Sequence, residues 1–227
     1  MTVSREEIVT AALDLLDAQG LDGLTLRRLA GRLGISAPTL YWHIKDKREL
    51  LDLVAERIFV EHQASQPPIT DIADPWERVA ESFRRQYHAI ISHRDAARVF
   101  AGNRPTEAML PYVDKWLGLW VKNGFPPGEA LTSVLSVGNY VIGAALEYEA
   151  EAAREQTQKR DLKALRAQIA PYPNLLRAAE ARRRDPAGRH ADFEHGLALM
   201  VAGLKARHAV LSGTKAAANQ NENALVD

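Results

Sequence analysis

The sequence predicts an all-α protein, with a three-helix head and a larger helical domain. Apolar residues recur at three- and four-residue spacing along the 227 residues, and strand-like alternation of apolar and polar residues is scarce. Lys and Arg number 29, Asp and Glu also number 29, and cysteine is absent. This composition is typical of a globular protein, and the absence of cysteine excludes disulfides, thiolate metal sites and a cysteine nucleophile.

The first helix is predicted to begin after Ser4, which can cap it, with Glu7 at the capping-box position. Its inward face carries Ile8 and Leu15, and Gly20 is expected to end it. Charged residues interrupt the apolar ones at helical spacing, which is unlike a signal peptide.

Two short helices follow with almost no connecting chain. Thr25 can cap a helix that runs to residue 33, and Gly34 can supply the left-handed residue of a sharp turn. Ser36 can cap the next helix, with Pro38 in its first turn, where a missing N–H costs nothing. Two short helices joined by a glycine-containing turn predict a helix-turn-helix.

The remaining chain divides into longer helices. Residues 49–63 form a connecting helix, the next helix opens at Asp74 and Pro75, and Gly- or Pro-containing connectors lie at 102–105, 124–128, 171–173 and 186–188. We expect residues 1–48 to form the head, 49–211 a second domain and 212–227 a disordered tail, because the last segment lacks an apolar face.

Residues 130–146 are uncharged but include Thr132, Ser133, Ser136 and Asn139. The run is too short and too polar to span a bilayer comfortably, so we expect no membrane association and a cytoplasmic protein. A helix that is apolar on every side must instead be buried on every side.

Charge is unevenly distributed. Residues 24–48 hold six basic residues against the single acid Asp46, although the whole chain has no net charge. Tyr41 and Trp42 fall on the outer face of the second short helix. A basic helix-turn-helix with exposed aromatic residues indicates binding to double-stranded DNA.

Residues 25–52 read TLRRLAGRLGISAPTLYWHIKDKRELLD, and this stretch resembles the DNA-binding domain of the tetracycline repressor family. The resemblance continues into the family's C-terminal domain at residues 92–107, which read SHRDAARVFAGNRPTE, and at residues 195–204, which read HGLALMVAGL. It therefore covers most of residues 4–208.

The resemblance implies which residues contact DNA. Arg27 matches an arginine that reads guanine, and His43 and Lys47 match residues that position the backbone. Two positions depart from the family pattern: Leu26 replaces a threonine, and Ala37 replaces a base-reading glutamine, so we expect a related operator with at least one changed base pair. The predicted DNA-facing residues are Thr25, Arg27, Ala37, Pro38, Thr39, Tyr41, Trp42, His43 and Lys47.

The resemblance also implies a pocket for a small-molecule effector. Family members that respond to tetracycline bind it as a magnesium chelate, but Phe100 stands here at the metal-binding histidine position, and only Glu147 is retained. Phenylalanine cannot coordinate a hard cation, so we expect no metal, no cofactor and a different effector, aromatic or polycyclic. The predicted pocket residues are Gln63, Ser82, Gln86, Phe100, Asn103, Trp116, Leu131, Leu135, Asn139, Ile142 and Glu147.

By the same resemblance, the helix around 130–146 and the last helix, about 191–208, form a four-helix bundle with a second subunit. A two-fold dimer places its recognition helices about 34–36 Å apart on a palindromic operator. The function that we expect is a dimeric transcriptional repressor, and effector binding would change that spacing.

Two alternatives remain open. The protein could be a ligand-independent regulator or an activator, or a helical small-molecule-binding protein that does not bind DNA. Enzymatic activity is not expected, because catalysis needs a paired acid and base or an activated nucleophile, and the seven histidines lack metal-ligand spacing such as H-E-x-x-H.

Overall fold

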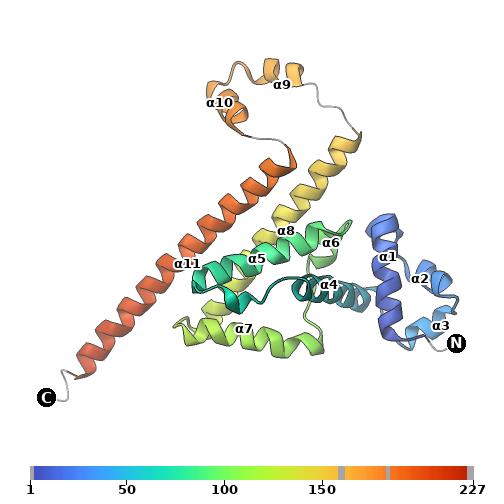
Figure 1. The fold of residues 1–227 in the computed structure, drawn as a ribbon, viewed down its shortest axis with the longest axis horizontal. Helices are drawn as coiled ribbons and strands as arrows, with labels where there is room; N and C mark the ends of the chain where they lie inside the picture. The colour runs from blue at the N-terminus through green and yellow to red at the C-terminus, as the bar shows by residue number, and fades with distance from the viewer. Residues whose placement is uncertain (1–2, 158–161, 183–184, 224–227) are drawn as a thin grey trace.

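The computed structural model describes residues 3–157, 162–182 and 185–223, and within these residues the chain is helical without strands (Figure 1). The head and connecting helices are α1 (Arg5–Gly23), α2 (Leu26–Leu33), α3 (Ala37–Tyr41) and α4 (Lys47–Ala64). The larger domain contains α5 (Pro75–Ile91), α6 (Ala96–Phe100), α7 (Leu110–Lys122), α8 (Pro127–Thr157), α9 (Leu162–Ile169), α10 (Pro173–Ala181) and α11 (Pro186–Asn223). Two short 3₁₀ turns, η1 (Ile69–Asp71) and η2 (Glu107–Met109), precede α5 and α7. The predicted fold class is confirmed.

The capping residues predicted in the head lie where the sequence indicated. Ser4 and Glu7 form a capping box, and the Thr25 hydroxyl accepts a hydrogen bond from the N–H of Arg28 at 3.2 Å. Gly34 ends α2 in the left-handed region at φ 66°, and Ser36 caps α3. These local hydrogen bonds fix the helix-turn-helix, because they satisfy backbone groups that each short helix leaves free.

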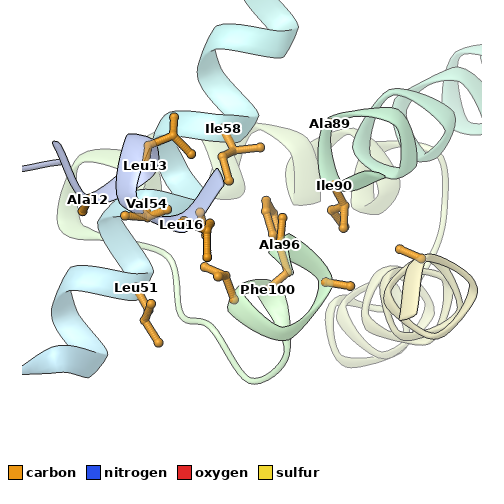
Figure 2. Packing of buried hydrophobic residues seen from close by; sticks show 14 of the residues in the cluster. Ala12, Leu13, Leu16, Leu51, Val54, Ile58, Ala89, Ile90, Ala96 and Phe100 are labelled. Carbon is orange, nitrogen blue, oxygen red and sulfur yellow. The ribbon is translucent and has the colours of Figure 1, made fainter. Parts of the chain in front are cut away.

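Helix α4 joins the head to the larger domain. Its buried residues include Leu50, Leu51, Val54 and Ile58. Figure 2 shows that side chains of α1, α4, α5 and α6 meet in one cluster around Ile58, so the two domains share a continuous core. The predicted connecting helix 49–63 lies within α4.

A polar seam attaches α1 to the segment before α6. The backbone N–H of Leu21 donates to the Asp95 carboxylate at 2.8 Å, and the His93 ring lies 2.9 Å from the Asp17 carboxylate. The backbone of Gly20, with φ 72°, breaks the helical geometry of α1, and a Cβ there would collide with Asp95. Gly20 therefore kinks α1, which continues to Gly23, and permits this close approach.

The larger domain packs α5 and α11 on α8 (Figure 1). Tyr87 of α5 is buried and stacks on Phe193 of α11, with ring centroids 3.8 Å apart. In this single chain α8 is buried along one face only, through residues such as Val137 and Val141, whereas Leu135 is 55% exposed. The prediction that α8 is buried on every side is therefore not met within one chain.

Residues 127–155 of α8 form the one helix in the described chain that is long and apolar enough, by length and composition, to cross a membrane. Such a helix is weak support for a membrane span. Its buried face packs against α5, α7 and α11.

The C-terminal segment differs from the prediction of a disordered tail from residue 212. Helix α11 continues through Asn223, and residues 224–227 lie outside the described residues. Residues 215–222 contain Ala, Gln, Glu and Lys. These residue types favour the helical conformation even though the segment has no apolar face. Local helix propensity therefore extends α11 beyond the part that packs against other elements.

Replacing Ile58 with alanine should lower the free energy of unfolding by about 2 to 5 kcal/mol, because its side chain is 1% exposed in the shared core. Urea unfolding followed by circular dichroism, at one fixed protein concentration, measures this change. Val60→Ala on the same helix is the matched control, since Val60 is 45% exposed, and should change the value by less than about 1 kcal/mol. Equal losses in the two variants would contradict the described packing.

Candidate functional site

The outer face of α3 is apolar and aromatic. Leu40 and Ile44 are fully buried and hold α3 and the turn after it against the head, whereas Tyr41 is 55% and Trp42 86% exposed. Ala37 and Pro38 are exposed in the first turn. So large an exposed aromatic surface on a short helix indicates contact with another molecule.

Thr25, Thr39 and His43 are half-buried at the edges of this face. The two threonine hydroxyls already bond within the head, Thr25 to the N–H of Arg28 and Thr39 to the Ser36 hydroxyl at 2.8 Å. Both hydroxyls therefore stabilise the N-terminal ends of α2 and α3.

Several cations of the head are paired within the protein. The Arg32 guanidinium lies 2.8 Å from the Asp14 carboxylate, and Arg48 lies 3.0 Å from Asp52. Arg28 donates to the Gln19 side chain at 3.0 Å, and the Lys47 ammonium donates to the Leu21 carbonyl at 3.4 Å. The local charge expected from residues 24–48 is thus partly neutralised by acids of α1 and α4.

Arg27 and Lys45 differ from these neighbours. Both are exposed, and within the described chain neither side chain has a hydrogen bond or an ion pair. An exposed, unpaired guanidinium near the start of α2, on the head that carries the aromatic face, suits a base edge or a phosphate.

A cavity of about 230 Å³ lies in the larger domain, between α4, α5, α7 and the segment from Phe100 to Met109. Helix α4 contributes a continuous wall of Asp52, Ala55, Glu56 and Phe59. The helix that supports the head therefore also lines the cavity. The other lining residues are Ser82, Phe83, Gln86, Phe100, Asn103, Arg104, Pro105, Thr106, Met109, Tyr112, Val113, Trp116 and Val134.

Five predicted pocket residues line this cavity, namely Ser82, Gln86, Phe100, Asn103 and Trp116. Six others do not, namely Gln63, Leu131, Leu135, Asn139, Ile142 and Glu147. Helix α8 presents Val134 to the cavity, whereas Leu131, Leu135 and Asn139 are exposed. Because α8 is apolar all round, its sequence did not indicate which face turns inward. Glu147 lines a different hollow, between α8, α10 and α11.

The polar groups of the cavity that remain available to a ligand include the amide groups of Gln86 and Asn103, the Arg104 guanidinium and the Tyr112 hydroxyl. None of these side chains has a hydrogen-bond partner among the described residues. The Ser82 hydroxyl donates to the Val79 carbonyl at 2.8 Å, and the Glu56 carboxylate accepts from Thr106. A largely apolar cavity with a few unused polar groups suits an aromatic molecule that carries hydrogen-bonding groups.

Sequence reasoning missed the aromatic pair formed by Phe59 and Tyr112. Their rings meet edge to face with centroids 5.7 Å apart, and burial raises the pKa of the Tyr112 hydroxyl. Tyr112 follows η2, and the irregular chain between Phe100 and Leu110 gave no periodic signal that would place it.

In the part of the chain that the structure describes, no histidine lines the cavity, and its two carboxylates, those of Asp52 and Glu56, are already bonded within the protein. Phe100, which is 5% exposed, contributes only hydrocarbon, and the Asp52 carboxylate already binds Arg48 and the N–H of Arg104. No group of three His, Asp or Glu side chains with metal-binding geometry occurs among the described residues. The residues that line this cavity therefore do not fit a magnesium chelate.

Two family models match the chain. Residues 8–54 match the model described as bacterial regulatory proteins, tetR family, and residues 68–208 match the tetracyclin repressor-like C-terminal domain. The first match contains the helix-turn-helix, and the second contains the cavity-lining segments of α5, α6 and α7.

Relatives match over most of their length. Tetracycline repressor protein class A from transposon 1721 of Escherichia coli is 38% identical over 208 residues, covering 90% of this chain and 91% of that protein. A structure of the class A repressor with 5a,6-anhydrotetracycline and magnesium has a TM-score of 0.62 and 32% identity, with 87% and 95% coverage. A structure of ActR from Streptomyces coelicolor with actinorhodin has a TM-score of 0.73 and 28% identity, with 92% and 99% coverage. The chain belongs to the tetracycline repressor family of transcriptional regulators, which joins a DNA-binding helix-turn-helix head to a ligand-binding C-terminal domain.

Proposed function

We propose that this protein is a homodimeric transcriptional repressor that an aromatic effector, and not a magnesium–tetracycline chelate, releases from a palindromic operator. The observation that carries the proposal is the shared role of α4, which supports the head through Leu50 and lines the cavity through Glu56 and Phe59. A ligand in the cavity and DNA at the head therefore act on the same helix.

The proposed dimer would bury the exposed apolar face of α8 and α11. Leu131, Leu135 and Leu199 are 44%, 55% and 61% exposed, and nothing lies near Gly138 or Gly203 on the side of the missing Cβ. Small residues beside exposed leucines allow a second pair of helices to pack closely. Sedimentation equilibrium checks this proposal, and a monomer at micromolar concentration would contradict it.

The proposed operator differs from those of family members that read it with glutamine at position 37. Alanine there cannot hydrogen-bond to a base edge, which removes about 1–3 kcal/mol of discrimination at that base pair. Selection of operators with the wild type and with Ala37→Gln checks this point, and identical preferences would contradict it.

Release of the protein from its operator would follow from the hydrogen bonds that connect the cavity lining to α4 and thus to the head. The Arg104 N–H donates to Asp52 of α4 at 3.1 Å, and Thr106 donates to Glu56. A ligand that displaces residues 103–106 would thereby move α4 and the attached head. Its effect on DNA binding is limited by the difference between its affinities for the two conformations.

The volume of the cavity limits the size of the proposed effector. A cavity of about 150 Å³ holds benzene, so about 230 Å³ holds a molecule of one or two rings. A polycyclic effector would require α7, which carries Trp116, to move outward. The unused amides of Gln86 and Asn103 favour a ligand-responsive regulator over the ligand-independent alternative, and we propose cytoplasmic action on DNA.

Arg27→Ala should weaken binding to the specific operator by about 1–3 kcal/mol and reduce the salt dependence of binding, because an exposed, unpaired guanidinium is lost. Fluorescence anisotropy with a labelled operator at several salt concentrations measures both effects. Arg32→Ala is the matched control on the same helix, since Arg32 is already paired with Asp14, and should have the smaller effect. A larger loss for Arg32→Ala would contradict the assignment.

A screen of aromatic compounds for release of the operator should find effectors that act equally with magnesium and with EDTA. Gln86→Leu should raise the effector concentration needed for half-release about tenfold, since one hydrogen bond is lost, while operator affinity stays unchanged. Gln63→Leu is the matched control, because Gln63 lies on α4 outside the cavity. Release by tetracycline that requires magnesium would contradict the proposal.

A further inference from the structure

A second cavity of about 230 Å³ lies on the other side of Trp116 from the effector cavity. It is enclosed by η1, the first turn of α5, α7, the connector before α8, and α11. Its wall is largely aromatic: Trp76 lies edge-on to Trp120, with centroids 6.5 Å apart, and Trp120 lies 5.2 Å from Phe125. Such walls can receive the edges and faces of a flat aromatic ring.

One charged side chain lines this aromatic cavity. The Nε of Arg78 is buried and has no hydrogen-bond partner among the described residues, and Arg78 forms no ion pair with any of them. By contrast, the His208 ring is already engaged, with its Nε2 2.8 Å from the Asn123 carbonyl oxygen. The terminal nitrogens of the guanidinium are not among the buried atoms, and the charge of Arg78 is not balanced by a carboxylate of the described chain, so Arg78 favours an anionic group in the cavity.

From this arrangement we propose that the second cavity is a ligand site for aromatic carboxylates of one or two rings. The ring would lie among Trp76, Trp120 and Phe125, and the carboxylate would accept hydrogen bonds from the Arg78 guanidinium. The volume exceeds the roughly 150 Å³ that holds benzene, and it is too small for a larger ring system without movement of the helices. A carboxylate is also the planar anion that a guanidinium binds through two parallel hydrogen bonds.

The second site is separate from the effector cavity, although the two share one wall. Trp116 lines both cavities, whereas Gln86 and Asn103 line only the first and Arg78 lines only the second. A carboxylate that shifts the Trp116 indole would change the affinity of the first cavity, and an effector would change the second to the same degree.

Isothermal titration calorimetry of the full-length protein with 1-naphthoate and indole-3-acetate tests the site. We expect one binding event per protomer, quenching of tryptophan fluorescence, and at least about tenfold weaker binding of 1-naphthamide, which lacks the negative charge. Arg78→Gln should weaken binding of 1-naphthoate about tenfold, and Arg78→Lys should weaken it less. Circular dichroism of each variant establishes that it is folded.

Gln86→Leu is the control for the effector cavity and should leave 1-naphthoate binding within about twofold of the wild type. Equal binding of the carboxylate and the amide would overturn the proposal, as would full binding by Arg78→Gln. Loss of binding in Gln86→Leu alone would assign these ligands to the effector cavity. If the wild-type protein does not bind 1-naphthoate at millimolar concentration, the proposed second site is also overturned.

Discussion

Helix α4 packs into the core that the head and the larger domain share, and it also forms one wall of the cavity. The proposed connection between ligand and DNA depends on this double constraint. Leu50 is fully buried beside the head, Ile58 is buried in the larger domain, and Phe59 lines the cavity one residue later. A close-packed helix transmits displacement because its side chains have no free volume in which to relax. Movement of one end of α4 therefore changes the packing at the other end.

The seam between α1 and the start of α6 supplies a second, polar connection between the domains. Asp95 holds the end of α1 through the Leu21 N–H, and Arg98 pairs with Asp22 at 2.9 Å. In the first turn of α6, the Ala97 N–H donates to the Glu149 carboxylate of α8 at 3.1 Å, and burial raises the pKa of Glu149. The N-terminal turn of α6 is thus fixed both to the head and to α8, and Phe100, where the helix ends, lines the cavity.

The sequence predicted those elements whose signals are local. Ser4, Thr25, Ser36 and Gly34 act on backbone groups a few residues away, so their roles follow from spacing alone. The pairing of Arg32 with Asp14 joins residues of two helices, and no spacing rule predicts it. The side of α8 that faces the cavity could not be predicted for a different reason. A helix without a polar stripe has no sequence pattern that distinguishes its buried face from its exposed face.

The head also explains why zero net charge does not exclude DNA binding. Acids such as Asp14 and Asp52 neutralise Arg32 and Arg48 from within the protein. These paired cations are restrained, which lowers the entropy cost of presenting a rigid surface but reduces their attraction for phosphate. Attraction for phosphate is then expected from Arg27 and Lys45, which are unpaired among the described residues, and from Arg28 and Lys47, which bond only neutral groups. Tyr41 and Trp42 add exposed aromatic surface. Four of the six cations of residues 24–48 have no acidic partner among the described residues, so the head keeps a local positive charge although the whole chain has none.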